Sequence, residues 1–396
     1  MQTVVLAAGE GTRMRPLTAD RPKPLLPVAD RPLVAHVLDA AAAAGASRFV
    51  IVVGYGADAV RRAIGREYAG VPVEYAVQER QRGTADAVAT ARPLLDDAPF
   101  AVVNGDALFP GDALGPLFDS ELTPAVAACL VDDPTNYGVL DLRDAHVSGV
   151  VEKPADPPSE VVNAGAYAFP AQALDWLDVP ESERGERELT DVLARCCGEF
   201  AVTPVRVERW LDVGRPWELL EANEWVVGDC GHDVRGAVRA NVSVRGPVVI
   251  EEGATVESGT VIEGPALVRT GATVGPNARV RPATVIGPDA TVGTAVEVKN
   301  SVLMDGATIP HHAYVGDSIL GPSVNFGAGT KVANLRHDGE DVKLTVCGER
   351  VSTGRRKFGV VAGPRAKTGI NASLNAGVTL SADSTVMPGE AVFRDR

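Results

Sequence analysis

Short apolar runs alternate with amphipathic segments along the first half of the chain. The runs at 2–9, 48–55, 71–77 and 100–106 are rich in valine, and segments 32–45 and 58–68 carry apolar residues at helical spacing. This strand–helix–strand order predicts an α/β fold with a mostly parallel, doubly wound sheet. Ligands of such sheets bind beyond the carboxyl ends of the strands, which is where Gly9 and Asp106 stand.

From about residue 240 the pattern changes to one aliphatic side chain at every sixth position. The period holds without a slip through Ile250, Val256, Ile262, Val268, Val274, Val280, Ile286, Val292 and Val298. A helix cannot place every sixth residue on one face, and an open strand has period two. A triangular coil with six residues per side explains the spacing, so the pattern predicts a left-handed parallel β-helix of hexapeptide repeats. A β-sandwich with accidental spacing is the alternative.

The two patterns predict two domains. The weakly patterned segment 226–238 separates them, which gives domains at 1–228 and 229–396. The six-residue period breaks near Met304 and again over 334–358, where the chain is polar. Insertions in solenoids emerge on one face and often carry the functional site, so we expect chemistry near this one.

Composition narrows the classes of partner. The formal net charge of the 396 residues is −14, which argues against nucleic acid or an anionic membrane as a partner. The sequence shows no long apolar run and no secretory leader, and its five cysteines have neither CxxC nor zinc spacing. We therefore expect a cytoplasmic protein without structural metal. Only seven of the 38 basic residues are lysine, a skew typical of a high-salt cytoplasm or of GC-rich coding.

Residues 6–28, LAAGEGTRMRPLTADRPKPLLPV, place four cations shortly after a glycine-rich turn. The stretch is neither a P-loop nor the dinucleotide-binding fingerprint, because the required lysine and third glycine are missing. The turn at Gly9 and Gly11 can bring backbone N–H groups to a phosphate, and Arg13 can bind pyrophosphate oxygens bidentately. Lys23, between two prolines, is a positioned point charge. A solvated loop is the alternative interpretation.

This stretch resembles the nucleotide-binding signature of sugar-1-phosphate nucleotidylyltransferases. Further motifs of that family follow in order over roughly residues 1–225: QERQRGTADAV at 78–88, NGDALF at 104–109, NYGV at 136–139, VEKP at 151–154, NAGAYAF at 163–169 and WLDVGRPWELLEAN at 210–223. The resemblance implies a Rossmann-like domain in which a sugar-1-phosphate attacks the α-phosphorus of UTP or dTTP. It implies catalytic Arg13 and Lys23, Mg²⁺ ligands Asp106 and Asp212, and substrate contacts from Gly9, Gly11, Gln78, Gly83, Thr84, Gly138, Glu152, Lys153 and Asn163.

These residue types suit that reaction. Both reactants are polyanions, so catalysis depends mostly on charge neutralisation and in-line positioning. Mg²⁺ held by the two aspartates would bridge the α-phosphate and the incoming phosphate, while Arg13 and Lys23 would stabilise the departing pyrophosphate. Gln78 would read a pyrimidine edge, and Lys153 would contact the sugar phosphate. A structural role in a turn is the alternative for each aspartate.

The end of the solenoid carries a second set of polar residues. The stretch EVKNSVLMDGATIPHHAYVGDSILGPSVNFGAGTKVAN at 297–334 resembles the acetyltransferase domain of the archaeal-type bifunctional enzyme that makes UDP-N-acetylglucosamine. The resemblance implies acetyl transfer from acetyl-CoA to glucosamine-1-phosphate. It implies His311 as general base, an oxyanion contact from the backbone N–H of Ala328, and substrate contacts from Arg281, Lys299, Tyr314, Asn325 and Asn334. The sequence departs from the family after Asn334, where the aromatic residue of the Asn-Tyr-Asp-Gly motif is lost.

Two assignments in the solenoid rest on the residues themselves. An amine must lose a proton to attack a thioester, and histidine is the natural base near neutral pH. Neighbouring strand side chains point opposite ways, so we expect His311 to face the cleft and His312 to face away. A surface histidine pair at a turn of the solenoid is the alternative. A basic cluster is predicted to bind the phosphates of coenzyme A, with a solvated face as the alternative: Arg355, Arg356, Lys357, Arg365 and Lys367.

The sequence thus predicts a cytoplasmic bifunctional enzyme. A homotrimer is expected, because the flat faces of such solenoids pack about a threefold axis, which would put the acetyltransferase cleft between subunits. Two rival hypotheses remain open. One is a nucleotidylyltransferase, uridylyl or thymidylyl, with a non-catalytic solenoid. The other is a regulatory subunit that binds sugar nucleotides without turnover, against which Arg13, Lys23, Asp106 and Asp212 argue.

Overall fold

The computed structural model describes residues 1–119, 124–182 and 185–396. These residues form two compact units. The first comprises Met1–Glu10, Pro22–Leu25 and Pro32–Asp212, and the second comprises Gly11–Arg21, Leu26–Arg31 and Val213–Arg396. Two short N-terminal segments and helix α5 (Pro216–Gly228) therefore group with the solenoid, although they precede the predicted boundary at 228.

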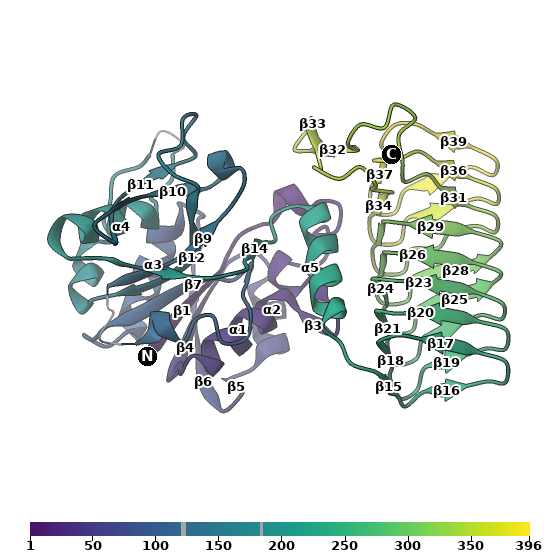
Figure 1. Cartoon of the computed structure of the whole chain (residues 1–396), viewed down its shortest axis with the longest axis horizontal. Helices are drawn as coiled ribbons and strands as arrows, with labels where there is room; N and C mark the ends of the chain where they lie inside the picture. Colours follow the sequence, from purple (N-terminus) through teal and green to yellow (C-terminus); the bar gives the residue numbers. More distant parts are fainter. Residues whose placement is uncertain (120–123, 183–184) are drawn as a thin grey trace. The chain divides into compact units, whose positions relative to one another are not determined.

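The first unit is built on a ten-stranded mixed sheet (Figure 1). Its main path runs β11 (His146–Glu152), β10 (Gly138–Arg143), β12 (Val161–Phe169), β7 (Phe100–Asn104), β1 (Gln2–Ala7), β4 (Arg48–Val53), β6 (Val71–Val77) and β5 (Glu67–Tyr68). Strand β9 (Ala125–Leu130) pairs with β12 and with β13 (Thr203–Arg206). The four strands predicted from the apolar runs are β1, β4, β6 and β7, and all their mutual pairings are parallel.

Helices cover both faces of this sheet. Helices α1 (Leu33–Ala43) and α2 (Ala57–Ile64) share one hydrophobic core with alternate residues of the central strands, including Val5 and Ile51. Helices α3 (Thr84–Ala91) and α4 (Leu189–Glu199) share the other, with Val4 and Val50. The helix predicted over 58–68 is shorter than expected, because Gly65 has φ 81° and the chain then enters β5.

Short elements complete the first half of the chain. The two-stranded pairs are β2 (Pro27–Val28) with β3 (Arg31–Pro32), and β8 (Ala107–Leu108) with β14 (Leu211–Asp212). The 3-10 helices are η1 (Thr12–Met14), η2 (Lys23–Leu25), η3 (Arg92–Leu94), η4 (Pro116–Phe118), η6 (Pro134–Asn136) and η7 (Ala171–Trp176). None of the helices in the described ranges has the length and apolar character needed to cross a bilayer.

The second unit contains the predicted parallel β-helix, whose short strands stack coil upon coil (Figure 1). One face carries β15 (Asp233–Val234), β18 (Val248–Ile250), β21 (Ala266–Val268), β24 (Thr284–Ile286), β27 (Val302–Leu303), β30 (Ile319–Leu320), β34 (Val361–Ala362) and β37 (Thr379–Leu380). The second carries β16 (Ala237–Val238), β19 (Thr255–Val256), β22 (Thr273–Val274), β25 (Thr291–Thr294) and β28 (Thr308–His311), followed by the pair β35 (Lys367–Thr368) and β38 (Thr385–Val386). The third carries β17 (Ser243–Arg245), β20 (Val261–Glu263), β23 (Arg279–Arg281), β26 (Glu297–Lys299), β29 (Tyr314–Gly316), β31 (Lys331–Val332), β36 (Ser373–Leu374) and β39 (Ala391–Val392).

The six-residue period is confirmed as the core of the solenoid. All nine aliphatic residues of the predicted series have no solvent exposure and belong to one hydrophobic cluster. Register pairs Ile250 with Val268 and Val268 with Ile286, so every third member stacks directly on its equivalent in the next coil. The next equivalent is Leu303, which marks the break predicted near Met304.

The polar insertion folds as a β-hairpin. Strands β32 (Lys343–Val346) and β33 (Glu349–Ser352) pair antiparallel through a turn at Cys347 and Gly348, both of which have positive φ. An isolated bridge joins Leu335 to Lys357 at the base of the insertion. The chain then returns to the solenoid at β34, which pairs with β30.

Candidate active sites

The carboxyl ends of β1, β6 and β7 border a cavity of about 230 Å³ in the first unit. Five residues of the predicted nucleotide site line it: Gly9, Gln78, Gly83, Thr84 and Asp106. The sequence motifs that resemble a nucleotidylyltransferase are thus brought together at one edge of the sheet, as expected for a doubly wound fold. Three polar lining residues were not predicted as site residues from the sequence, namely Gln81, Asn104 and Glu186.

The backbone around Arg187 closes one wall of this cavity against Gly83. A Cβ at Gly83 would lie 2.3 Å from the carbonyl oxygen of Arg187, and Gly83 has φ 110°. The N–H of Ala85 donates to that same oxygen at 3.0 Å. Thr84 holds the following segment, because its hydroxyl accepts a hydrogen bond of 2.8 Å from the N–H of Leu189 at the start of α4. Glycine is required at position 83 by the close backbone approach.

The amide of Gln78 is held in one orientation. Its Nε2 donates to a carboxylate oxygen of Asp86 at 2.8 Å and to the carbonyl oxygen of Gly83 at 3.2 Å. A carbonyl oxygen and an ionised carboxylate only accept hydrogen bonds, so both amide hydrogens point at these partners. The carbonyl oxygen of Gln78 is therefore the group left to accept a hydrogen bond from a ligand in the cavity.

Lys23, Asp106 and Asp212 are the charged residues of the first unit that were predicted for phosphate and metal binding. Lys23 is buried, and its ammonium forms an ion pair with the carboxylate of Asp106. Asp212 lies opposite Ala107, the residue after Asp106, in the antiparallel pair β14–β8. The carboxylates predicted as ligands suit Mg²⁺, which is commonly bound through one or two carboxylates plus substrate phosphates. Among residues 1–119, 124–182 and 185–396, no group of three or more potential side-chain ligands from His, Cys, Asp and Glu occurs, so any metal here would depend on the substrate for further ligands.

Two predicted phosphate contacts, Gly11 and Arg13, belong to the second unit. Gly11 has φ 64° and precedes η1, which contains Arg13. The guanidinium of Arg13 packs against Gly214, where a Cβ would lie 3.3 Å from Nη2. Gly214 follows Asp212 closely in sequence, and its N–H donates to Glu218 at 2.7 Å. The roles of Gly11 and Arg13 stay predictions.

The predicted sugar wall is a cluster in the mixed part of the sheet. Gly138 on β10 lies directly opposite Glu152 on β11. A Cβ at Gly138 would lie 2.9 Å from Oε2 of Glu152 and 3.7 Å from Cβ of Asn163, so the three residues adjoin. Lys153 follows with φ 46°, and its N–H donates to the carbonyl oxygen of Tyr137 at 2.9 Å. The absence of a side chain at Gly138 makes room for the carboxylate of Glu152.

Asn163 connects this wall to the cavity through Gly165. The amide of Asn163 donates to the hydroxyl of Tyr167 at 2.6 Å and accepts from the N–H of Gly165 at 3.0 Å. Gly165 has φ 74°, and a Cβ there would lie 2.4 Å from the amide nitrogen of Asn104, which lines the cavity. Burial raises the pKa of Tyr167, so its hydroxyl remains protonated and able to hydrogen-bond.

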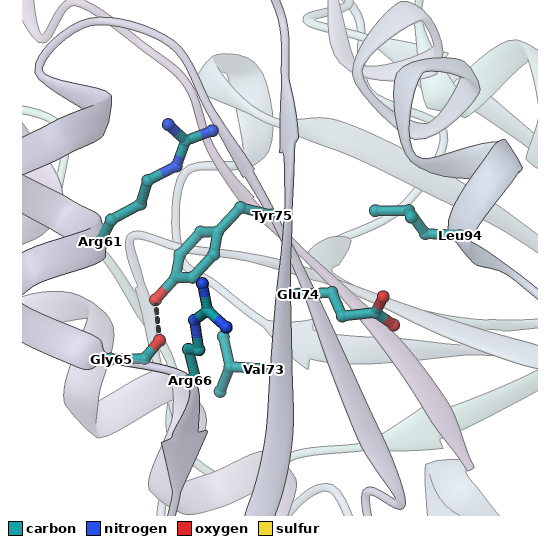
Figure 2. A pocket seen from close by; sticks show the side chains of 7 residues that line it. All are labelled: Arg61, Gly65, Arg66, Val73, Glu74, Tyr75 and Leu94. Atoms are coloured by element: carbon teal, nitrogen blue, oxygen red, sulfur yellow. Dashed lines mark hydrogen bonds between the residues drawn. The ribbon is translucent and has the colours of Figure 1, made fainter.

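A larger cavity of about 570 Å³ lies elsewhere on the first unit (Figure 2). It is lined by residues of α2, β6 and their neighbours, including Arg61, Arg66 and Tyr75. The hydroxyl of Tyr75 donates to the carbonyl oxygen of Gly65 at 2.5 Å, and the Arg61 guanidinium stands 5.7 Å from the Tyr75 ring centre. None of the predicted site residues lines this cavity, so we do not assign the nucleotide to it.

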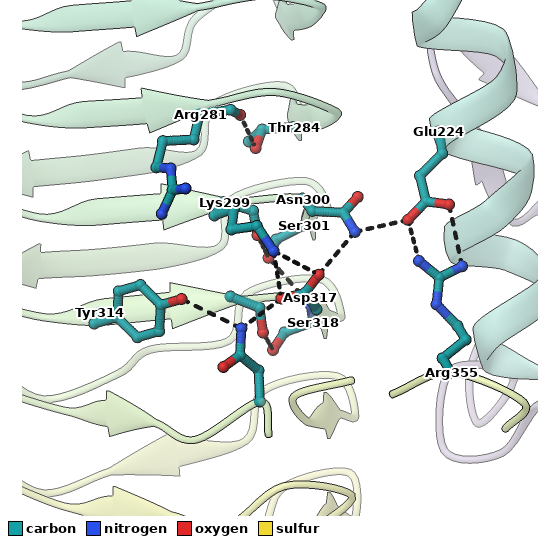
Figure 3. Close-up of polar contacts among 12 residues, drawn as sticks. Glu224, Arg281, Thr284, Lys299, Asn300, Ser301, Tyr314, Asp317, Ser318 and Arg355 are labelled. Atoms are coloured by element: carbon teal, nitrogen blue, oxygen red, sulfur yellow. Dashed lines mark hydrogen bonds and ion pairs between the residues drawn. The ribbon is translucent and has the colours of Figure 1, made fainter. Parts of the chain in front are cut away.

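In the solenoid, three predicted sugar-phosphate residues gather around Asp317 (Figure 3). Only 2% of Asp317 is exposed. The ammonium of Lys299 donates to both carboxylate oxygens at 3.0 Å, and the amide of Asn334 donates to one of them. Asn334 also lies 3.3 Å from the hydroxyl of Tyr314. Asp317 belongs to the motif that carried the resemblance, but the sequence alone suggested no role for it.

Arg281 stands beside this cluster. It lies in register with Lys299 in the neighbouring coil, and its guanidinium is paired with Glu297 at 3.0 Å. Burial and the nearby Asp317 carboxylate raise the pKa of Tyr314, so the phenol is neutral around physiological pH. Both cations predicted to hold the sugar phosphate therefore already have carboxylate partners, which fix where their charges lie.

The remaining acetyltransferase residues lie on a different face of the solenoid. A cavity of about 450 Å³ is lined by Asn325, Arg365 and Lys367, together with Thr308 of β28. Asn325 bridges Thr308 on one side and Lys367 on the other. His311 ends β28, and its carbonyl oxygen accepts from the N–H of Gly329 at 2.9 Å, which places Ala328 alongside it in the next coil.

The expected opposition of His311 and His312 is not observed. Both side chains are exposed, and their ring centres are 5.9 Å apart in an edge-to-face arrangement. His312 has φ 55°, so the chain turns a corner of the coil between the two residues. Strand alternation does not apply across such a corner. The choice of His311 as the base stays a prediction that rests on the resemblance.

Two members of the basic cluster predicted for coenzyme A have carboxylate partners. Arg355 forms a bidentate pair with Glu224, and Arg365 pairs with Asp383 at 2.7 Å and also with Asp20. The other three are exposed: Arg356, Lys357 and Lys367. Arg365 and Lys367 both line the 450 Å³ cavity, whereas Arg355, Arg356 and Lys357 are not among its lining residues.

Comparison with known proteins finds a matching family model in each half of the chain. Residues 2–227 match the nucleotidyl transferase family model, and residues 262–361 match a model described as the GMPPB C-terminal domain. A bifunctional sugar-1-phosphate nucleotidylyltransferase/acetyltransferase of Sulfurisphaera tokodaii is 36% identical over 100% of this chain and 98% of its own length. The bifunctional protein GlmU of Methanocaldococcus jannaschii is 39% identical over 100% and 95%.

The chain belongs to the bifunctional sugar-1-phosphate nucleotidylyltransferase/acetyltransferase family. Two shorter proteins match its first half. A UTP–glucose-1-phosphate uridylyltransferase of Haloferax volcanii is 37% identical over 57% of this chain and 96% of its own length. A solved structure of a "Putative Glucose-1-Phosphate Thymidylyltransferase" from Bacillus anthracis, in complex with sucrose, is 26% identical with a TM-score of 0.53, over 59% of this chain and 97% of that chain.

Proposed function

We propose that the first half transfers a nucleotidyl group from UTP or dTTP to a sugar-1-phosphate such as N-acetylglucosamine-1-phosphate, with release of pyrophosphate. The observation that carries this proposal is the 230 Å³ cavity at the strand ends, which five predicted nucleotide residues line in a chain of this family. The base enters against Gln78, and Gly83 and Thr84 pack beside it. The sugar lies along the wall formed by Gly138, Glu152 and Asn163, with Lys153 at its phosphate.

The chain's own residues neutralise and align the reacting phosphates. Arg13 binds the leaving pyrophosphate, and the buried Lys23 adds a fixed positive charge next to Asp106. Asp106 and Asp212 would hold Mg²⁺, which supplies charge neutralisation between the triphosphate and the incoming phosphate when it is bound. The sugar phosphate is the nucleophile, so no protein side chain needs to form a covalent bond.

We further propose that the solenoid acetylates glucosamine-1-phosphate with acetyl-CoA. Arg281 and Lys299 hold the sugar phosphate, while Tyr314, Asn325 and Asn334 contact the sugar. His311 takes the proton from the attacking amine, and the N–H of Ala328 stabilises the thioester oxyanion. Arg356, Lys357, Arg365 and Lys367 are the exposed cations of the basic cluster, and we propose that they meet the phosphates of coenzyme A.

We also propose that the enzyme is a homotrimer. The predicted acetyltransferase residues lie on two faces of one solenoid, so a neighbouring copy would bring the complementary face to each cleft. Because UTP and acetyl-CoA are cytoplasmic metabolites, we also propose that the enzyme acts in the cytoplasm. Sedimentation of the purified full chain tests the trimer.

One assay tests both activities. Purified protein is mixed with glucosamine-1-phosphate, acetyl-CoA, UTP and Mg²⁺, and the products are identified by mass spectrometry. Free coenzyme A, pyrophosphate and UDP-N-acetylglucosamine are the expected products. Nucleotidyl transfer to N-acetylglucosamine-1-phosphate without any thiol release would show that the solenoid is not catalytic. Failure to release pyrophosphate with any sugar-1-phosphate would contradict the first proposal.

A further inference from the structure

Glu224 on helix α5 connects that helix to the polar cluster of the solenoid (Figure 3). Its Oε1 accepts a hydrogen bond of 2.7 Å from the amide of Asn300. The same carboxylate is held bidentately by Arg355 of the polar insertion, with one contact of 3.1 Å. Both Glu224 and Arg355 are largely shielded from water, with side-chain exposures of 25% and 22%.

Asn300 also forms a hydrogen bond with Asp317. Its amide nitrogen donates to Asp317 Oδ1 at 2.9 Å as well as to Glu224. Because carboxylates only accept hydrogen bonds, Glu224 and Asp317 together fix the amide nitrogen of Asn300 on the side that faces them. The consequence is visible on the other side of the group: the carbonyl oxygen of Asn300 is buried without a partner among the described residues. Glu224 and Asp317 therefore hold the Asn300 amide in this orientation, although its buried carbonyl oxygen has no hydrogen-bond donor among the described residues.

Asp317 in turn sets the groups that face the sugar phosphate. It accepts from Lys299, Asn300 and Asn334, so its carboxylate has a fixed position only while all three donors stay in place. The charges in this part of the molecule also balance pairwise, with Lys299 against Asp317 and Arg355 against Glu224. Removal of the Glu224 carboxylate would leave Arg355 uncompensated and free the amide of Asn300 to turn.

We propose that Glu224 is a positioning residue for the sugar-phosphate site of the acetyltransferase, and that it acts through Asn300 and Asp317 on Lys299 and Asn334. This inference rests on the proposed acetyltransferase function. Helix α5 lies almost wholly within residues 2–227, which match the nucleotidyl transferase model, and it packs against β21 and β24 of the solenoid. The segment that closes the nucleotidylyltransferase half therefore also builds part of the acetyltransferase half.

Kinetics of the full-length E224A and E224Q variants test the proposal, with E221A as a control at an exposed position of the same helix. Thiol release is measured against glucosamine-1-phosphate and, separately, against acetyl-CoA. E224A should raise the KM for glucosamine-1-phosphate about tenfold while kcat and the KM for acetyl-CoA change less than about threefold, because a displaced binding group weakens ground-state and transition-state binding alike. E224Q should give about a threefold rise, since its amide oxygen still accepts from Asn300. E221A should match the wild type.

Calorimetric binding of glucosamine-1-phosphate to each variant gives a readout independent of turnover. The affinity should fall about tenfold in E224A, in step with KM. Should E224A fail to fold, as judged by lost pyrophosphate release, the threefold effect in E224Q carries the test. An active wild type whose E224A and E224Q variants keep the same KM and affinity would overturn this inference alone. A wild type that neither binds nor acetylates glucosamine-1-phosphate would overturn the acetyltransferase proposal and this inference together.

Discussion

The ammonium of Lys23 forms an ion pair with the carboxylate of Asp106. Asp106 directly precedes Ala107, which faces Asp212 across the pair β14–β8. Lys23 and Asp106 are separated by 83 positions in the sequence. The pair places a buried positive charge beside the Asp106 carboxylate, just after the carboxyl end of β7, where the substrate phosphates are proposed to meet.

Replacement of Asp106 should abolish pyrophosphate release and leave acetyl transfer intact. Asp106→Asn and Asp106→Ala remove the carboxylate that pairs with Lys23 and is proposed to hold Mg²⁺, so we expect a loss on the order of 10² to 10³ in nucleotidyl transfer. Phosphate detection coupled to pyrophosphatase measures this rate. Asp112→Asn, at an exposed position of the same unit, is the matched control. If thiol release fell equally in a folded variant, the two sites would not be independent.

Asp86 should control base selection through Gln78. With the Gln78 carbonyl presented to the base, the N3–H of uracil or thymine is the matching donor, so UTP and dTTP should each be preferred over ATP and GTP by at least roughly tenfold. Asp86→Asn allows the Gln78 amide to flip and should reduce both UTP turnover and this preference. Competitive turnover of the four triphosphates provides the measurement. A purine triphosphate that is favoured by the wild type would contradict the assignment.

Substitutions of His311 and of His312 should have different effects on the rate of acetyl transfer. His311→Ala removes the proposed general base and should lower the rate by about 10² to 10⁴, whereas His312→Ala should keep most of the activity. Thiol release from acetyl-CoA with glucosamine-1-phosphate is compared for the two variants, and pyrophosphate release should be unchanged in both. Because both rings are exposed at one corner of the coil, loss of activity only in His312→Ala would move the base by one residue. Full activity in both would remove the main support for acetyl transfer.

Gly83→Ala should damage the nucleotide site specifically. The added methyl would meet the Arg187 carbonyl oxygen at 2.3 Å and would have to occupy φ 110°, so the wall of the cavity must shift. We expect a KM for UTP raised at least about tenfold, because a small misplacement of binding groups is costly. Gly111→Ala is the control, since that position has open space around it. Unchanged UTP kinetics in Gly83→Ala would show that this wall does not contact the nucleotide.

Cysteine reactivity should report burial. Cys347 is exposed at the tip of the insertion hairpin, whereas Cys196 lies on the buried face of α4, where burial raises its pKa to about 12. The thiolate is the reactive form, so at pH 8 Cys196 is almost wholly protonated and inert. Peptide mapping after iodoacetamide treatment should show labelling of Cys347 at least about tenfold faster. Labelling of Cys196 at a comparable rate would indicate that the α4 layer opens.

Much of the architecture was readable from local sequence. The buried strands β1, β4, β6 and β7, the nine stacked aliphatic residues and the polar insertion all lie where the hydrophobic pattern predicts. These features depend on side chains that are close in sequence, because an inward-facing residue must recur at the period of its own element. Likewise Gly9 and Asp106 could be assigned to one site, since the ends of parallel strands meet at one edge of a sheet.

Tertiary structure alone decided which partners these residues have. The hydrogen bonds from Asn300 to Glu224 and Asp317 join helix α5 to the solenoid, and no repeat in the sequence relates these two segments. The requirement for glycine at position 83 comes from the backbone of Arg187, and the orientation of Gln78 comes from Asp86. The chain turns a corner between His311 and His312, so the alternation of side-chain direction expected within a strand does not apply to them. Sequence patterns record which residues turn inward, whereas hydrogen bonds and ion pairs depend on which distant segments the fold brings within a few ångströms of each other.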